Sequence, residues 1–199
     1  MNQLMRAAVA VLIALGASGC ALLGGAKAPK NLITLSATAP SPGPIARSGN
    51  AAETVTVEDP IVAKEIRTTR VAAQTGSTVI AYIKDLTLID TPDKLFKNLL
   101  AETILRTTNR VVLDPKQSSL DPGLLVSGRL TDFGYEGGQG TVLVRYDAAL
   151  SVAGGTRVDT RRFEARAPAD GTAATVGPAL NQAANEVAAQ VAQWVGNGR

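Results

Sequence analysis

The chain has 199 residues, of which 45% are hydrophobic, 4% aromatic and 19% charged, which is enough for one domain and too few for two sizeable ones. Its 20 Lys and Arg residues against 17 Asp and Glu residues leave a formal charge of +3, an excess too small to indicate a nucleic-acid partner. The sequence has no histidine and one cysteine, which excludes Ser-His-Asp and Cys-His catalytic sites, imidazole zinc sites and internal disulfides.

Residues 1–19 have the layout of a secretory signal peptide. A short start with one cation, Arg6, is followed by an apolar run from Ala7 to about Leu15 and then by small residues up to Gly19. As a helix, the stretch from Ala7 to Gly19 spans only about 20 Å, less than the hydrocarbon core of about 30 Å. We therefore expect this segment to be cleaved rather than to cross the membrane permanently.

The stretch Ala17–Cys20 resembles a bacterial lipobox, with Ala17 in place of the usual Leu. In a lipobox the cysteine thiol receives a diacylglycerol before cleavage, so Cys20 is the predicted lipidation site, with fatty chains such as palmitate. Two or more acyl chains hold a protein on a bilayer, because each buried CH2 contributes about 0.8 kcal/mol. The alternative is an ordinary signal peptide with a chance cysteine. By resemblance to bacterial lipoproteins, Ala21 after the cysteine implies an outer-membrane protein that faces the periplasm.

Residues 20–30 are rich in Gly, Ala, Lys and Pro and are predicted to be a lipidated tether. We expect residues 31–199 to form a single periplasmic domain. Its first predicted elements are a short strand, Leu32–Leu35, and a surface loop or second linker over 39–52. A further strand is expected at Val55–Val57.

A β-hairpin is predicted next, from the runs Glu65–Ala73 and Thr78–Leu88 on either side of a turn at 74–77. A helix should then begin at Thr91-Pro92-Asp93, where Thr91 can cap and Pro92 suits the first helical position. Apolar residues at three- and four-residue steps extend this helix to about Arg106. The cations Arg106 and Arg110 near its end suit the negative pole of the helix dipole.

The second half of the chain predicts more sheet and a last helix. Val111–Leu113 is a short strand, and alternating apolar residues then predict strands over 124–131, 142–152 and 157–167. A hairpin turn at Gly137–Gly140 joins the first two of these three, which should form an antiparallel meander. Thr172–Val195 repeats apolar residues at helical spacing. Two helices cannot cover both faces of six or seven strands. We therefore expect an α/β (α+β) two-layer sandwich, a mixed, mostly antiparallel sheet with two main helices on one face.

Few residues suggest a chemical site, and we expect no metal, cofactor or catalysis. The glycines at 137–140 do not begin a helix, so they predict a turn rather than a phosphate-binding loop. A basic cluster of four arginines can contact an acidic partner or lipid headgroups, or it can be a solvated face with Glu164 and Asp159 as counter-ions. Its members are Arg157, Arg161, Arg162 and Arg166. In an extended strand Arg162, Glu164 and Arg166 should share one face.

The order of these features resembles that of the ABC-type transport auxiliary lipoproteins, the family that includes the PqiC-like proteins. The resemblance rests on the lipobox, the strand Leu32–Leu35, the run Thr54–Pro60, the stretch Tyr82–Leu100 and the terminal helix Asn181–Trp194. It implies a non-catalytic periplasmic adaptor at the outer membrane, working with an ABC permease, its ATPase and an Mce-domain protein in lipid transport. Such a subunit can assemble as a homo-oligomer.

Two other functions are compatible with the residues. One is a structural or envelope-assembly lipoprotein, such as a partner of a lipopolysaccharide-export or secretion complex. The other is an enzyme that uses carboxylates alone, for which the nearest candidates are Asp85, Asp90 and Asp93.

Overall fold

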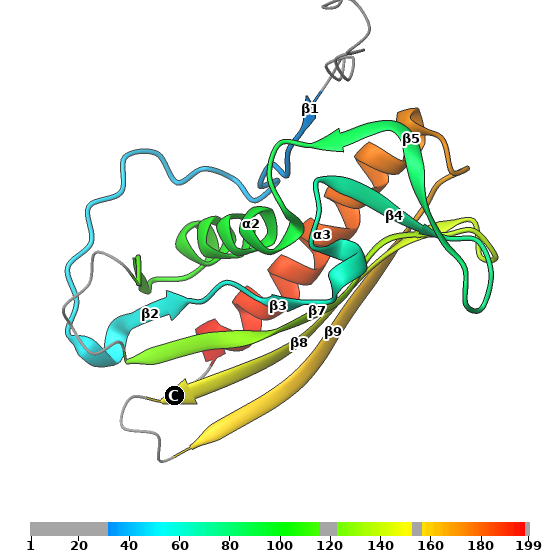
Figure 1. Cartoon of the computed structure of the whole chain (residues 1–199). Helices are drawn as coiled ribbons and strands as arrows, with labels where there is room; N and C mark the ends of the chain where they lie inside the picture. Colours follow the sequence, from blue (N-terminus) through cyan, green and yellow to red (C-terminus); the bar gives the residue numbers. More distant parts are fainter. Residues whose placement is uncertain (1–31, 116–122, 153–156, 198–199) are drawn as a thin grey trace, which may run out of the picture.

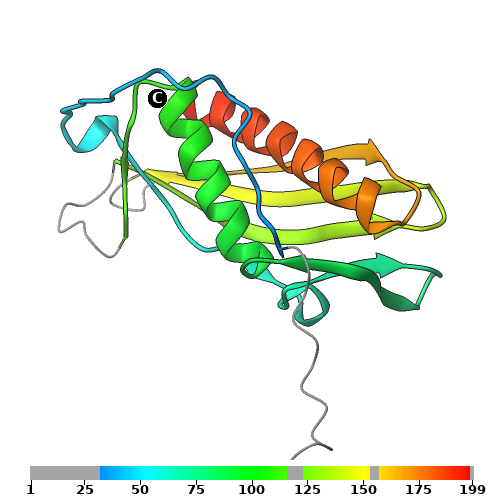
Figure 2. The same ribbon diagram turned by 90° about the horizontal axis from the view of Figure 1, so that it is seen from above.

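The computed structural model describes residues 32–115, 123–152 and 157–197. Within these residues the chain forms one mixed sheet of nine strands and two long helices. Figure 1 shows both helices, α2 and α3, on the same side of the sheet, and Figure 2 shows them crossing over its strands. The predicted mixed α+β fold is confirmed.

The predicted meander forms the largest part of the sheet. It consists of β7 (Leu124–Glu136), β8 (Thr141–Val152) and β9 (Val158–Pro168). β8 pairs antiparallel with both neighbours, in registers that place Tyr146 beside Leu130 and Phe163. Because side chains alternate along a strand, one face of the meander carries most of the buried apolar residues. The other, here called the outer face, carries the charged ones together with the buried Leu143.

The long strand β7 also pairs with three short strands on its other edge. These are β2 (Thr54–Val57), β3 (Ile61–Val62) and β4 (Arg70–Gln74), and all three run parallel to it. β3 was not predicted, because two residues after Pro60 are too short to show alternation. The predicted strand from Glu65 is wrong at its start, since residues 64–66 form a 3-10 turn and β4 begins only at Arg70.

At Gly134 the backbones of β4 and β7 approach closely. A Cβ at this position would lie 2.4 Å from the carbonyl oxygen of Ala72, its partner in β4. A non-glycine residue here would therefore have to displace β4 from β7.

The predicted hairpin is confirmed: β4 pairs antiparallel with β5 (Ile80–Leu88). At the sheet edges, β1 (Leu32–Ile33) lies parallel to β5, and β6 (Val111–Leu113) lies parallel to β2. β1 is two residues shorter than predicted, because the chain leaves the sheet after Ile33.

The two helices run over α2 (Pro92–Thr107) and α3 (Ala173–Asn197), close to their predicted limits. Thr91 occupies the predicted cap position of α2, but its side chain makes no capping hydrogen bond. Instead the backbone N–H of Thr91 donates to Asp90 at 2.7 Å. Before α3, the carboxylate of Asp170 accepts hydrogen bonds from the N–H of Thr172 at 2.9 Å and its hydroxyl at 2.7 Å.

The core lies between the helices and the inner face of the sheet. Phe96 of α2 packs against Tyr146 of β8 with ring centroids 5.1 Å apart, and Trp194 of α3 packs against Phe163 of β9 at 5.5 Å. The helices also contact each other, and Figure 2 shows them closest near their C-terminal ends. Among the described residues of this core, the hydroxyl of Tyr146 is buried without a hydrogen-bond partner.

Candidate functional site

The predicted anchor and its surroundings lie outside the described residues. This applies to the signal peptide 1–19, to Cys20 and to the tether 20–30. The described chain begins at Leu32, in the edge strand β1.

After β1 the chain crosses the helix layer as an extended segment, here called the strap (Thr34–Ala39). Figure 2 shows it passing between α2 and α3. Asn185 of α3, only 8% exposed, holds its centre. The Oδ1 of Asn185 accepts from the N–H of Thr38 at 2.7 Å and its hydroxyl at 3.0 Å, and the Nδ2 donates to the carbonyl of Ser36 at 2.9 Å.

Two further side chains hold the strap. Asn181, one turn before Asn185, accepts the N–H of Ser36 at 2.8 Å. From α2, Arg106 donates to the carbonyl of Ala39 at 2.8 Å and to Glu102 at 2.6 Å. The strap is therefore tied to both helices, although its end was predicted to lie at the start of a loose surface loop.

Sequence reasoning missed the role of these residues. Arg106 was expected to serve the pole of its own helix, whereas its guanidinium reaches the strap. A signal for the asparagines was present, because Asn181 and Asn185 are four residues apart on a helix otherwise rich in Ala and Val. Residues at this spacing share a face, and a polar pair on a buried face needs partners.

Arg110 lies where the C-terminal ends of both helices meet. Its Nε donates to the carbonyl of Val195 in α3 at 3.1 Å, and its Nη1 donates to the carbonyl of Ala52 at 3.0 Å. Arg110 was predicted to interact with the C-terminal end of α2, but it binds a carbonyl at the C-terminal end of α3. Burial lowers the pKa of Arg110. Beside it opens a cavity of about 800 Å³ whose walls include Leu124, Ala189 and Ala192.

The four predicted arginines do not form one patch. Arg162 and Arg166 lie on the outer face of β9, whereas Arg161 lies on the other side of the strand, over the ring of Phe163 at 5.1 Å. Arg157 precedes β9 and pairs with Asp159 at 3.1 Å. The alternation of side chains along β9 separates neighbours in sequence onto opposite faces.

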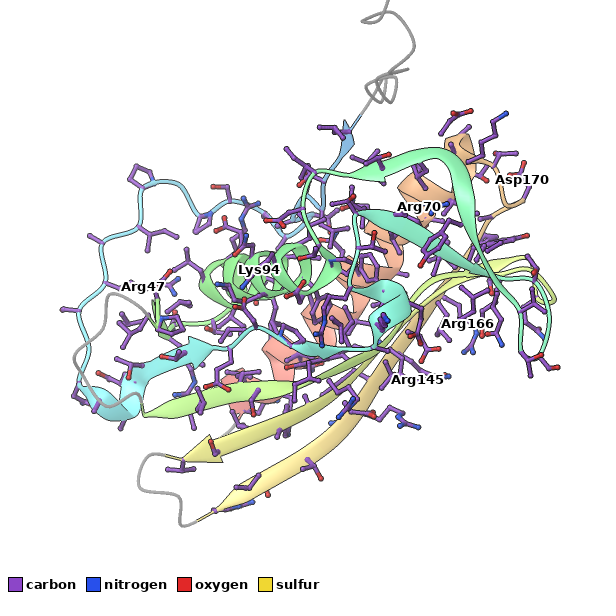
Figure 3. The ribbon with its side chains drawn as sticks, in the orientation of Figure 1. Arg47, Arg70, Lys94, Arg145, Arg166 and Asp170 are labelled. Carbon is purple, nitrogen blue, oxygen red and sulfur yellow. The ribbon has the colours of Figure 1, made fainter. Side chains whose placement is uncertain are left out.

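On the outer face the charges form ion pairs across the strands. Arg145 of β8 lies between Asp132 of β7 and Glu164 of β9, at 2.8 Å from each. Arg162 contacts Asp147 at 2.6 Å, and Arg166 contacts Glu164 at 2.9 Å. Figure 3 shows Arg145 and Arg166 on this face, away from the helices.

These pairs lower the pKa values of two of the carboxylates. Hydrogen bonds from Arg145 and Arg166 hold the pKa of Glu164 below its usual value, and the hydrogen bond from Arg162 does the same for Asp147. The charges of the outer face balance one another within the sheet. This face therefore resembles a solvated surface with paired charges more than a basic patch that docks an acidic partner.

The carboxylates considered for catalysis are dispersed. Asp85 lies in β5 at a backbone φ of 58°, Asp90 binds the N–H of Thr91, and Asp93 lies in the first turn of α2. In the ranges that the structure describes, no group of three or more acidic or cysteine side chains is arranged to hold a metal ion. Among those same ranges, no helix is long and apolar enough to cross a membrane.

The fold has relatives among solved structures. A crystal structure of a Xanthomonas campestris protein of the family DUF330 superposes with a TM-score of 0.68 at 18% identity, covering 83% of this chain and 93% of that one. An uncharacterized protein superposes with a TM-score of 0.59 at 15% identity, covering 83% of this chain and 99% of that one. No curated protein matches the sequence.

The sequence itself matches a family model. The model described as ABC-type transport auxiliary lipoprotein component aligns with residues 34–192. This range begins in the strap and ends in the last turns of α3, so it includes α2, most of α3 and eight of the nine described strands. The chain therefore belongs to the ABC-type transport auxiliary lipoprotein family.

Proposed function

We propose that this protein is a non-catalytic, lipid-anchored subunit that joins an ABC/Mce-type lipid transport system to the outer membrane. The observation that carries the proposal is the family match over residues 34–192. A transport auxiliary component acts with an ABC system. We further propose that the partner is an Mce-domain protein and that the membrane is the outer membrane.

The anchor in this proposal is Cys20. Cleavage ahead of this residue leaves an acylated N-terminus, and Ala21 favours sorting to the outer membrane with the domain in the periplasm. The pairing of β1 with β5 supports this arrangement, because it fixes the point at which the described chain enters the domain.

The adaptor role follows from the chemistry that the sequence lacks. Without histidine, and without a nucleotide-binding loop, the subunit depends on a separate ATPase for energy. Its contribution is then to bind: to the membrane through the anchor, to an Mce-domain protein that passes lipids across the envelope, and to further copies of itself as a homo-oligomer. No cofactor or nucleic acid takes part.

Crosslinking in intact cells followed by purification of this protein tests the proposal. We expect an Mce-domain protein, an ABC permease and its ATPase to be recovered with the wild type. The Cys20→Ala variant, which cannot be acylated, should leave the outer-membrane fraction while its fold is retained. Recovery of a lipopolysaccharide-export or secretion complex in place of the transporter would contradict the proposal.

A further inference from the structure

We propose that the surface around β1 and the end of β5 lies against the lipid bilayer that carries the anchor. This surface, here called the β1–β5 patch, consists of Leu32, Ile89, Arg70 and Tyr82. The inference rests on the proposed function, because it requires an anchor at Cys20. It adds a second membrane contact, made by folded residues.

Two aliphatic side chains form the apolar part of the patch. Leu32 is 54% exposed and Ile89 is 59% exposed. The pairing of Ile33 with Leu88, both turned toward the core, places Leu32 and its partner Thr87 on the opposite side of the strands. The N–H of Ile89 donates to the carbonyl of Ile33 at 2.9 Å, which extends the ladder by one residue. Alternation then places Ile89 on the same side as Leu32.

A cation and a phenol ring border these aliphatic residues. Arg70 of β4 pairs with Thr87 and so continues the row that starts at Leu32. Its guanidinium lies 4.0 Å from the ring centroid of Tyr82, and Figure 3 shows Arg70 between β4 and β5. At a membrane surface, tyrosine rings lie at headgroup level and arginine can place an apolar stem in the interface with its charge in water.

The patch lies close to the predicted anchor, which favours a lipid bilayer as the surface that it contacts. Leu32 is 12 residues after Cys20, a length of chain that spans at most about 43 Å. Leu32 is therefore the described residue that is closest along the chain to the anchor, and the β1–β5 ladder places Ile89 beside it. Its exposed aliphatic residues can enter the interfacial region of the membrane at that distance.

The nearby acids determine the kind of contact. Lys84, Asp85 and Asp90 are also exposed close to the patch, so that together with Arg70 the two positive and two negative charges balance. We therefore expect insertion of Leu32 and Ile89 rather than electrostatic attraction to anionic lipid.

Probes on single introduced cysteines test the inference in the full, acylated chain. Cys20 is the chain's one cysteine and is blocked by acylation, so Leu32→Cys and Ile89→Cys can each be labelled with an environment-sensitive fluorophore. Val158→Cys is the matched control, because Val158 is also aliphatic and 58% exposed. It lies at the start of β9, far from β1 in both ribbon views (Figures 1 and 2).

Each labelled protein is reconstituted into phosphatidylcholine vesicles that contain a lipid with a quencher near its headgroup. We expect a blue shift and strong quenching for the probes at 32 and 89, and neither for the probe at 158. Equal, water-like emission at all three positions would overturn the inference. So would a blue shift that depends on protein density and not on the quencher, because it would assign the patch to a second copy.

Mass spectrometry of the same samples separates the two proposals. If Cys20 is acylated and the probes remain in water, the bilayer contact fails while the anchor stands. If Cys20 carries a bare thiol, the lipid-anchored function itself fails, and the bilayer contact fails with it.

Discussion

The helix layer and the outer face of the sheet use polar side chains in different ways. On the outer face, Arg145 and Glu164 meet charges on neighbouring strands, and water reaches them. In the helix layer, Asn185 is 8% exposed and binds backbone groups of the strap. Exposed ion pairs contribute about 0–1 kcal/mol, whereas a buried group that loses its partner costs about 1–3 kcal/mol. The contacts of Asn185 with the strap should therefore contribute more to stability than the ion pairs of the outer face.

The largest effect is expected from Asn185→Leu. The variant leaves the N–H of Thr38 and the carbonyl of Ser36 without partners, or releases the strap, at a cost of about 3 kcal/mol in the free energy of unfolding. Urea denaturation, followed through the fluorescence of Trp194, measures it. Asn181→Leu is the control, because its contact with Ser36 is exposed and its loss should cost less. Equal losses in the two variants would contradict this account of the strap.

The next effect is expected from Arg106→Met, at about 1–2 kcal/mol. It removes the donor to Ala39 and the ion pair with Glu102 while keeping most of the aliphatic stem. Hydrogen exchange of the Thr38 amide should become faster. Arg67→Met is the matched control, since Arg67 also donates to a backbone carbonyl, that of Val62, away from the strap. Faster exchange at Thr38 in the control would argue against a specific role for Arg106.

On the outer face, Arg145→Met should cost less than about 1 kcal/mol, because its two carboxylate partners return to water. The same denaturation experiment measures it, and added salt should reduce the difference from the wild type. A loss as large as that of Asn185→Leu would reverse the comparison between the two regions.

The smallest effect concerns pH and the start of α3. Hydrogen bonds from Thr175 and Thr172 lower the pKa of Asp170 from 3.8 to about 2. Since the folded state holds the lower pKa, the contribution of this carboxylate to stability is present above pH 3.8 and is lost as the pH falls toward 2. NMR titration of the Asp170 carboxyl measures the pKa. The Asp170→Asn variant should lack this part of the acid dependence, and a titration midpoint near 4 would contradict the assignment.

Local signals were enough to predict much of the fold. Proline and acidic residues at the start of α2, with apolar residues at helical spacing, predicted a helix close to Pro92–Thr107. Strict alternation predicted the strands of the meander. Both signals depend on neighbours in the chain, so they can be recognised without knowledge of tertiary contacts.

Contacts between distant residues decided the rest. β3 exists because Ile61 and Val62 lie beside β7, and the strap exists because Asn185, 147 residues beyond Thr38, turns toward it. Alternation predicted that Arg162 and Arg166 share a face of β9, but the ion pairs of Arg162 with Asp147 and of Arg166 with Glu136 join strands distant in the chain. Neighbours in the sequence determine the long helices and the strands of the meander. Packing of α3 on the sheet decides which polar groups are buried and must be paired, because only the assembled core removes water from them.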